Sequence, residues 1–262
     1  MSALSPAAAQ QRTVFDVMDN RGALLGWEAV GRLDLPGGFC TGALIGRDLV
    51  LTAAHCVYDT ETGQPRPAQG MMFRAGYHRG SEIVARRVAR WVAPEAYEAI
   101  MRGGGSPTTG AAVATDVALL KLESAVSSAE ADPFRVHEDS ADGTRVSVVS
   151  YGRGREEVLS REPDCQMTRR YRGDILGFDC DVTFGSSGAP VFVREDGRLR
   201  ILSVISSGTA SGESYGPSLP RLVSELSGRL MRAESRPKVT AGAKRVIVGG
   251  GREASGARFV RP

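Results

Sequence analysis

The chain has 262 residues, of which 42% are hydrophobic and 24% are charged, with a formal net charge of +3, a balance typical of a globular protein. No apolar run approaches the roughly 18 residues of a membrane span, because the longest candidate, 42–58, contains Arg47, Asp48 and His55. The 32 glycines and 13 prolines favour many short strands and turns over long helices.

The first half of the chain predicts an N-terminal arm followed by a set of strands. Residues 1–25 form the expected arm, in which 5–10 resembles the end of a secretory signal with a cleavage point near Ala9. A helical turn is expected at 53–57 and a flexible loop at 102–115. Strands are expected at 28–33, 42–45, 49–52, 71–76, 83–92 and 117–122. Residues 26–123 are therefore assigned to a first structural unit.

The second half predicts further strands, then a helix and a tail. After a linker at 124–132, a helix is expected at 219–232, and residues 124–232 are assigned to a second unit. The basic tail 233–262 has little hydrophobic periodicity and is expected to be disordered; a short basic run is usually only solvated, so nucleic-acid binding is not expected. The expected strands of this unit are 145–151, 166–170, 177–181, 190–193 and 200–206.

Three short motifs carry candidate chemistry. His55 lies in Leu-Thr-Ala-Ala-His-Cys, Asp116 opens Asp-Val-Ala-Leu-Leu, and Ser187 lies in Gly-Ser-Ser-Gly-Ala-Pro. Taken singly, they could be a core histidine, a strand cap and a turn serine. Together and in this order, separated by 61 (116−55) and 71 (187−116) residues, they suit nucleophilic acyl transfer: a hydroxyl attacks, an imidazole moves the proton and a carboxylate orients the imidazole.

On these motifs the chain resembles the chymotrypsin-like, trypsin-fold serine endopeptidases, and most closely their bacterial secreted trypsin-like and V8-like branch. The resemblance implies an all-β fold: two six-stranded antiparallel barrels with the active site in the cleft between them, and a short C-terminal helix. It implies that Ser187 is the nucleophile, His55 the general base and acid, and Asp116 the group that orients His55. The N–H groups of Gly185 and Ser187 would form the oxyanion hole.

The four cysteines allow three pairings, and their spacing does not choose among them. The resemblance implies Cys40–Cys56 and Cys165–Cys180, and disulfides in turn imply an oxidising compartment. A zinc site is the rival interpretation, disfavoured because no Cys-x-x-Cys is present. We therefore expect no metal or cofactor, and a secreted or periplasmic location.

The resemblance also suggests a substrate pocket. Asp181 lies six residues before Ser187, where trypsin-like members carry the acid that selects Arg or Lys before the cut, and Ser206 and Gly208 match the pocket edge that binds substrate backbone. Glutamyl-specific members carry a histidine where this chain has Ile205. Asp181 could instead face outward from a turn after Cys180. Ser186 replaces the aspartate of the digestive branch, so activation by an ion pair with a new N-terminus is not expected.

The resemblance implies a protein or peptide substrate for a monomeric protease. The alternative is a non-catalytic or latent binding protein on the same fold, a class that usually lacks one residue of the triad. An α/β-hydrolase is excluded because it would place its serine before its histidine.

Overall fold

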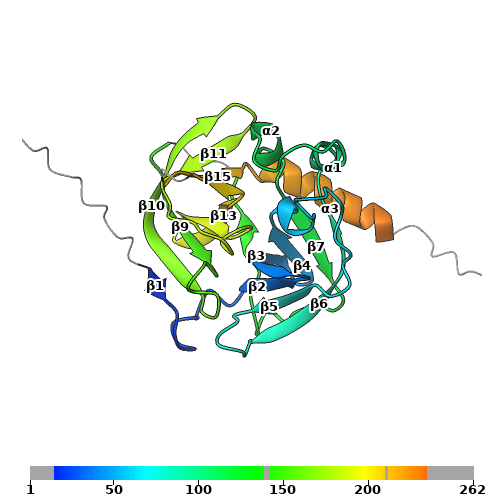
Figure 1. The fold of residues 1–262 in the computed structure, drawn as a ribbon. Coiled ribbons are helices and arrows are strands. Elements are labelled where there is room, and N and C mark those ends of the chain that lie inside the picture. The colour runs from blue at the N-terminus through cyan, green and yellow to red at the C-terminus, as the bar shows by residue number, and fades with distance from the viewer. Residues whose placement is uncertain (1–14, 139–141, 210–211, 235–262) are drawn as a thin grey trace, which may run out of the picture.

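The computed structural model describes residues 15–138, 142–209 and 212–234, which form two β-sheet halves with helices at their margins (Figure 1). The first half is a closed barrel in the order β2-β3-β4-β7-β6-β5. Its strands are β2 Val30–Leu35, β3 Gly38–Gly46, β4 Leu49–Thr52, β5 Met72–Ala75, β6 Val84–Val92 and β7 Ala118–Leu122. This barrel confirms the first of the two that were expected.

The second half departs from the expected six-stranded barrel. Its nine-stranded sheet runs β14-β15-β11-β10-β9-β12-β13-β8 with β1 on β10, and no hydrogen bonds close it among the described residues. It is also not wholly antiparallel, because β8 runs parallel to β13. Its strands are β1 Asp16–Val17, β8 Arg135–Val136, β9 Arg145–Ser150, β10 Ser160–Tyr171, β11 Ile175–Phe178, β12 Pro190–Glu195, β13 Arg198–Val204, β14 Ser207–Gly208 and β15 Ser214–Pro217.

The helices lie between and after the sheets. A 3-10 turn, η1 (Ala54–Cys56), follows β4 as expected. The loop expected at 102–115 is instead partly helical: α2 (Gly110–Val113) begins where the Thr109 side chain accepts the N–H of Ala112. The sequence interpretation also missed α1 (Glu95–Arg102), which buries Tyr97 and Met101 one turn apart.

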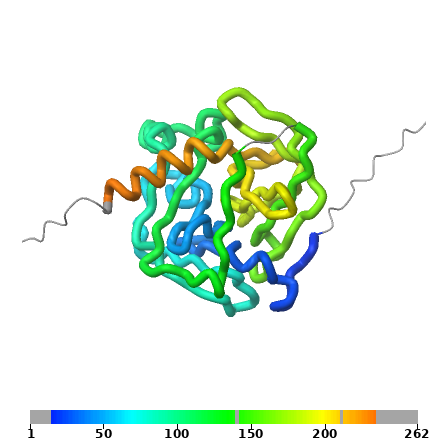
Figure 2. Tube along the Cα trace, turned by 180° about the vertical axis from the view of Figure 1, so that it is seen from behind, coloured from blue at the N-terminus to red at the C-terminus, as the bar shows by residue number. Residues whose placement is uncertain are grey.

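The expected C-terminal helix is present as α3 (Pro220–Glu234). It contacts β6 and β7, and Figure 2 shows it crossing the back of the first barrel. Leu222, Leu226 and Leu230, spaced at one helical turn, are buried against this barrel. The tail 235–262 and residues 1–14 lie outside the described residues. The structure therefore does not test the expectations for the tail, for the signal remnant and for most of the arm.

One hydrophobic cluster joins the two halves. It contains Val30 and Leu51 of the first barrel together with Val149, Tyr151 and Phe192 of the second sheet. Trp27 packs edge-on against Phe192 with ring centroids 5.3 Å apart. Because these side chains are buried, separating the halves would expose a continuous apolar surface. Residues contributed by both halves are therefore held in a fixed relation.

Two disulfides confirm the pairing implied by the resemblance, Cys40–Cys56 in the first half and Cys165–Cys180 in the second.

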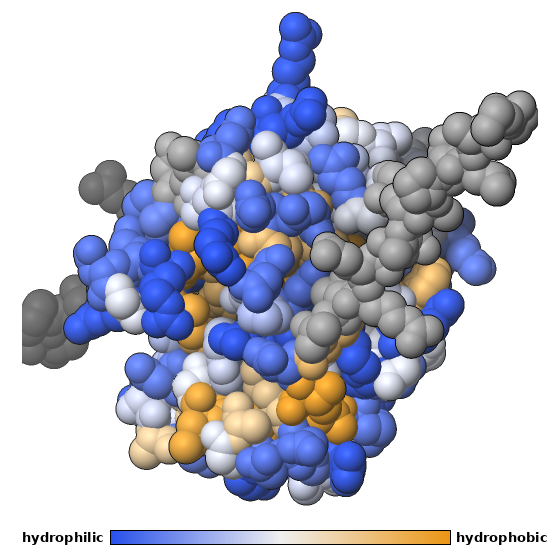
Figure 3. All heavy atoms as spheres, turned by 90° about the vertical axis from the view of Figure 1, so that its left-hand side faces the viewer, coloured by the Kyte–Doolittle hydropathy of each residue, from blue (hydrophilic) through white to orange (hydrophobic). Residues whose placement is uncertain are grey.

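The face that carries β1 and β10 is mainly hydrophilic (Figure 3). Among the described residues, no helix has the length and apolar character needed to cross a membrane.

Candidate active site

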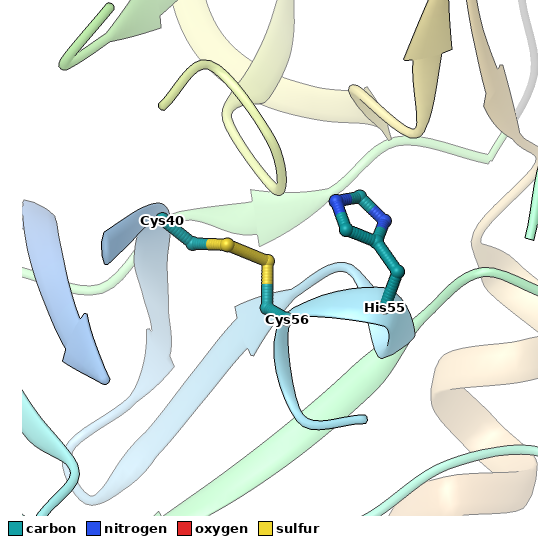
Figure 4. Close-up of side chains that lie close together, drawn as sticks. All are labelled: Cys40, His55 and Cys56. Carbon is teal, nitrogen blue, oxygen red and sulfur yellow. A yellow bond between two sulfur atoms is a disulfide. The ribbon is translucent and has the colours of Figure 1, made fainter. Parts of the chain in front are cut away.

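His55 and Asp116 meet because of the register of two strands. Thr52 at the end of β4 pairs with Ala118 at the start of β7, so η1 and the residues before β7 lie at the same end of the barrel. Asp116 Oδ2 lies 2.7 Å from Nδ1 of His55, and Oδ1 accepts the backbone N–H of His55 at 2.8 Å. The carboxylate therefore holds both the ring and the backbone of the histidine. Figure 4 shows the imidazole beside the disulfide that fastens η1 to β3.

The second half adds a donor to the same carboxylate. The hydroxyl of Ser206, which immediately precedes β14, donates to Oδ2 of Asp116 at 2.6 Å. Asp116 is fully buried, so its charge depends on these donors in place of water. The sequence analysis placed Ser206 in the substrate pocket and missed this bond, which joins residues 90 positions apart.

Asp116 also sets the protonation of His55. Burial of the imidazole opposes its charged form, but the negative charge and hydrogen bond of Asp116 outweigh this, and the pKa of His55 is raised above 6.5. With Nδ1–H donated to Asp116, Nε2 of the neutral ring carries the lone pair. Such a ring can accept a proton from a neighbouring hydroxyl.

The loop before Ser187 adopts a conformation that requires glycine. The N–H of Ser186 donates to the carbonyl of Thr183 at 2.9 Å, and Gly185 has φ of +90°, which together define a type II turn. A Cβ on Gly185 would collide with the carbonyl oxygen of Tyr151 and the ring of Phe39. No other residue fits this position without a shift of the backbone.

The turn directs one peptide group toward the cleft. The carbonyl of Phe184 accepts the N–H of Arg153 at 2.8 Å, so the N–H of Gly185, on the opposite side of the same trans peptide, points away from Arg153. In the described part of the chain, no protein acceptor is recorded for the N–H groups of Gly185 and Ser187. Both donors are available to a ligand.

Thr41 on β3 fastens this loop to the first barrel. Its hydroxyl donates to the carbonyl of Gly185 at 2.8 Å and accepts the N–H of Tyr151 at 3.0 Å, while its own N–H donates to the carbonyl of Ser187 at 2.9 Å. Thr41 is completely buried. These three bonds place the Ser187 loop relative to the barrel that carries His55.

Two openings adjoin Ser187 and His55, and both residues line each of them. The β3 opening, of 490 Å³, is bounded on the other side by residues 35–40 at the β2–β3 turn. The β14 opening, of 560 Å³, is bounded by residues 182–184 and 205–209, which include Ser206 and Gly208. Arg153 and Phe184 line both openings. Ser187, His55, Ser206 and Gly208 thus all line the β14 opening.

Asp181 does not join them. It is exposed and is absent from the lining of both openings. Its N–H donates to Glu162 Oε2 at 2.8 Å, and its negative charge opposes the lowering of the pKa of Arg155 that burial causes. Burial is the main reason that the pKa of Glu162 rises to about 7. Sequence reasoning did not single out Glu162.

Two clusters of potential metal ligands occur among the described residues: Cys40, His55 and Cys56, and Glu162, Cys165 and Cys180. Each contains a disulfide. Because a metal binds the thiolate form of cysteine, neither set offers a sulfur ligand while the disulfide is intact.

Comparisons with known proteins give consistent results. Residues 40–200 match the family model described as a trypsin-like peptidase domain. A serine protease of Anopheles gambiae is 30% identical over 183 residues, which cover 69% of this chain and 58% of the length of that protease. The fold is similar to that of a Glu endopeptidase, with a TM-score of 0.63 and 20% identity over 80% of this chain and 92% of the other. It is also similar to the protease Anisep of Arthrobacter nicotinovorans, with a TM-score of 0.61 and 19% identity over 76% and 93%.

Proposed function

Because the chain belongs to the family of trypsin-like peptidase domains, we propose that it is a serine endopeptidase that cleaves peptide bonds through an acyl-enzyme. The proposal depends on one observation above all. A buried carboxylate, Asp116, is hydrogen-bonded to Nδ1 of His55 at 2.7 Å beside a cleft that His55 shares with Ser187. Burial of a carboxylate away from water is energetically unfavourable. Such a group is expected in an active site, where it orients a catalytic base.

In the proposed reaction, Ser187 Oγ attacks the carbonyl carbon of the peptide bond while His55 Nε2 takes the hydroxyl proton. Asp116 stabilises the imidazolium that forms, and stays ionised. His55 then gives the proton to the leaving amine, the C–N bond breaks and an acyl ester remains on Ser187. Water, deprotonated by His55, hydrolyses the ester and restores the hydroxyl.

The oxyanion of the tetrahedral intermediate is assigned to the N–H groups of Gly185 and Ser187. The type II turn supports this assignment because it directs the Gly185 N–H away from Arg153, which occupies the carbonyl side of that peptide. Loss of one such donor typically costs about 2.7–4 kcal/mol of transition-state stabilisation.

The preference for Arg or Lys before the cut remains a prediction. Its support is the position of Asp181 six residues before Ser187; the exposure of Asp181 and its absence from the lining of the β14 opening count against it. Peptide-library profiling of Asp181→Ser against the control Asp164→Ser, which removes an exposed charge on β10, is the test. A profile identical to that of the unmodified protein would exclude Asp181 as the selecting acid.

The proposed enzyme acts on proteins or peptides in an oxidising compartment. The Cys40–Cys56 and Cys165–Cys180 bridges support an extracytoplasmic location, because reducing compartments do not maintain such bonds. A secreted or periplasmic site and a monomeric state are parts of the same proposal.

Labelling with a fluorophosphonate probe, followed by mass spectrometry of the adduct, tests the activity. The unmodified protein is expected to react at Ser187 alone, Ser187→Ala is expected not to react, and Ser224→Ala on the exposed face of α3 is expected to react normally. Circular dichroism should show the fold unchanged in Ser187→Ala. A folded protein that neither reacts nor cleaves any member of a peptide library would support the alternative of a non-catalytic binding protein.

A further inference from the structure

An arginine and a phenylalanine stand together where the two openings meet. The guanidinium of Arg153 lies over the ring of Phe184, 4.3 Å from its centroid, a distance typical of a cation–π contact. Phe184 is 74% exposed, an unusual position for a large apolar side chain. The backbones of the two residues are joined by the hydrogen bond from Arg153 N–H to Phe184 C=O at 2.8 Å. The pair is held by its backbone but exposed at its side chains.

The guanidinium of Arg153 has spare binding capacity. Among the described residues, the guanidinium forms neither an ion pair nor a hydrogen bond, and its contact is the stacking on Phe184. Stacking occupies the face of a guanidinium and leaves its N–H groups, which lie in the plane, available to a carboxylate.

The other cation of the β3 opening is already engaged. Arg66 donates from Nε to the carbonyl of Tyr58 and from Nη1 to the carbonyl of Pro36, both at 3.0 Å, and its Nη2 lies 3.6 Å from Asp59. Its donors therefore hold the wall of the opening together, and of the described residues that line this opening, Arg153 is the cation left to meet a ligand.

Glu156 is the carboxylate that lines the β3 opening. It accepts the N–H of Gly154 at 2.8 Å, and this bond is the main reason that its pKa is lowered, with a smaller contribution from the charge of Arg153. Its separation from the guanidinium exceeds ion-pair distance, so a ligand carboxylate does not have to displace it.

The two openings correspond to the two sides of a scissile bond. If residues 206–208 bind the backbone of the acyl part, as the family resemblance implies, the leaving group departs through the β3 opening, because Ser187 and His55 stand between the two. We propose that Arg153, held on Phe184, determines specificity by binding an acidic side chain in the first two residues after the cut. This inference rests on the proposed function.

Quenched fluorescent peptides with one fixed, cleavable acyl sequence and an amidated C-terminus test it. The first or second residue after the cut is Glu, Gln or Lys, and kcat/KM is measured for each. The ratio of Glu to Gln is expected to be about fivefold or more at one of these positions and to fall as NaCl is added, as for a partly exposed ion pair. A second set of peptides, with Gln after the cut and a free C-terminus, tests whether the carboxylate of the peptide C-terminus raises kcat/KM as much as a Glu side chain does.

The matched variants are Arg153→Gln and Arg198→Gln, which removes the same charge at an exposed position on β13. The ratio is expected to fall to about one in Arg153→Gln and to remain in Arg198→Gln. Since the ratio is taken within each variant, a general loss of activity cancels. A Glu-to-Gln ratio near one in the unmodified protein would overturn this inference alone, and so would an undiminished ratio in Arg153→Gln. The same holds if a free C-terminus raises kcat/KM while Glu does not. Absence of both peptide cleavage and probe labelling would overturn the proposed function and this inference with it.

Discussion

Replacing Thr41 by valine tests whether the link between the two halves maintains the site. The change keeps the branched shape and removes one hydroxyl. The carbonyl of Gly185 loses its donor at 2.8 Å, and the N–H of Tyr151 loses its acceptor at 3.0 Å. All three residues are buried, so water cannot replace the lost partners.

The expected cost follows from the two orphaned groups. A buried polar group left without a partner costs about 1–3 kcal/mol, so Thr41→Val, which orphans two such groups, should lower the free energy of unfolding by about 2–6 kcal/mol. Since the carbonyl of Gly185 helps to fix the turn that presents its N–H, kcat should also fall about tenfold. That is less than the 100-fold or greater loss typical of removing an oxyanion donor outright.

Urea unfolding measures the first quantity and peptide hydrolysis the second. Thr168→Val, the same chemical change on the exposed face of β10, removes a hydrogen bond to Glu213 that water can replace, and it should lower stability by no more than about 1 kcal/mol. A loss below about 1 kcal/mol in Thr41→Val, with kcat unchanged, would show that the threonine bonds do not hold the Ser187 loop.

Two further predictions concern protonation. The inactive form of His55 is the imidazolium, and the pKa of His55 is raised above 6.5. The rate of labelling by the fluorophosphonate should therefore rise with pH through a midpoint above 6.5. A midpoint below that value would contradict the assigned pairing with Asp116. Glu162 has a pKa of about 7 in the fold against 4.5 when unfolded, so the unfolded chain binds fewer protons between these values and stability must fall as pH rises through them, by up to about 3 kcal/mol. Glu162→Gln should therefore be more stable than the unmodified protein at pH 8 and converge with it near pH 4.5 in thermal melts, and parallel curves would refute this.

The sequence predicted best what is encoded locally. The His55, Asp116 and Ser187 motifs each lie beside a strand or turn that the neighbouring residues specify, and most strands of the first barrel lie within two residues of their expected bounds, although β3 begins four residues before its expected start. A four-residue helix such as α2 has no periodicity to detect, and its Thr109 cap was interpreted as part of a loop.

What the sequence could not provide depends on distant contacts. The strand expected at 177–181 ends at Phe178, because Asp179 accepts the N–H of Gln166 and the N–H of Asp181 donates to Glu162. These side-chain bonds replace the strand ladder and direct Asp181 away from the openings. In the same way, the hydrogen bond from Ser206 to Asp116 joins the two halves, and no local sequence pattern predicts it.

The position of α3 in the chain has a consequence for biosynthesis. Leu222, Leu226 and Leu230 belong to one buried cluster with Val117, which follows Asp116 in the chain, and with Leu119 of β7. During translation these leucines emerge after both sheets, so the pocket around Asp116 stays incompletely packed until they have left the ribosome.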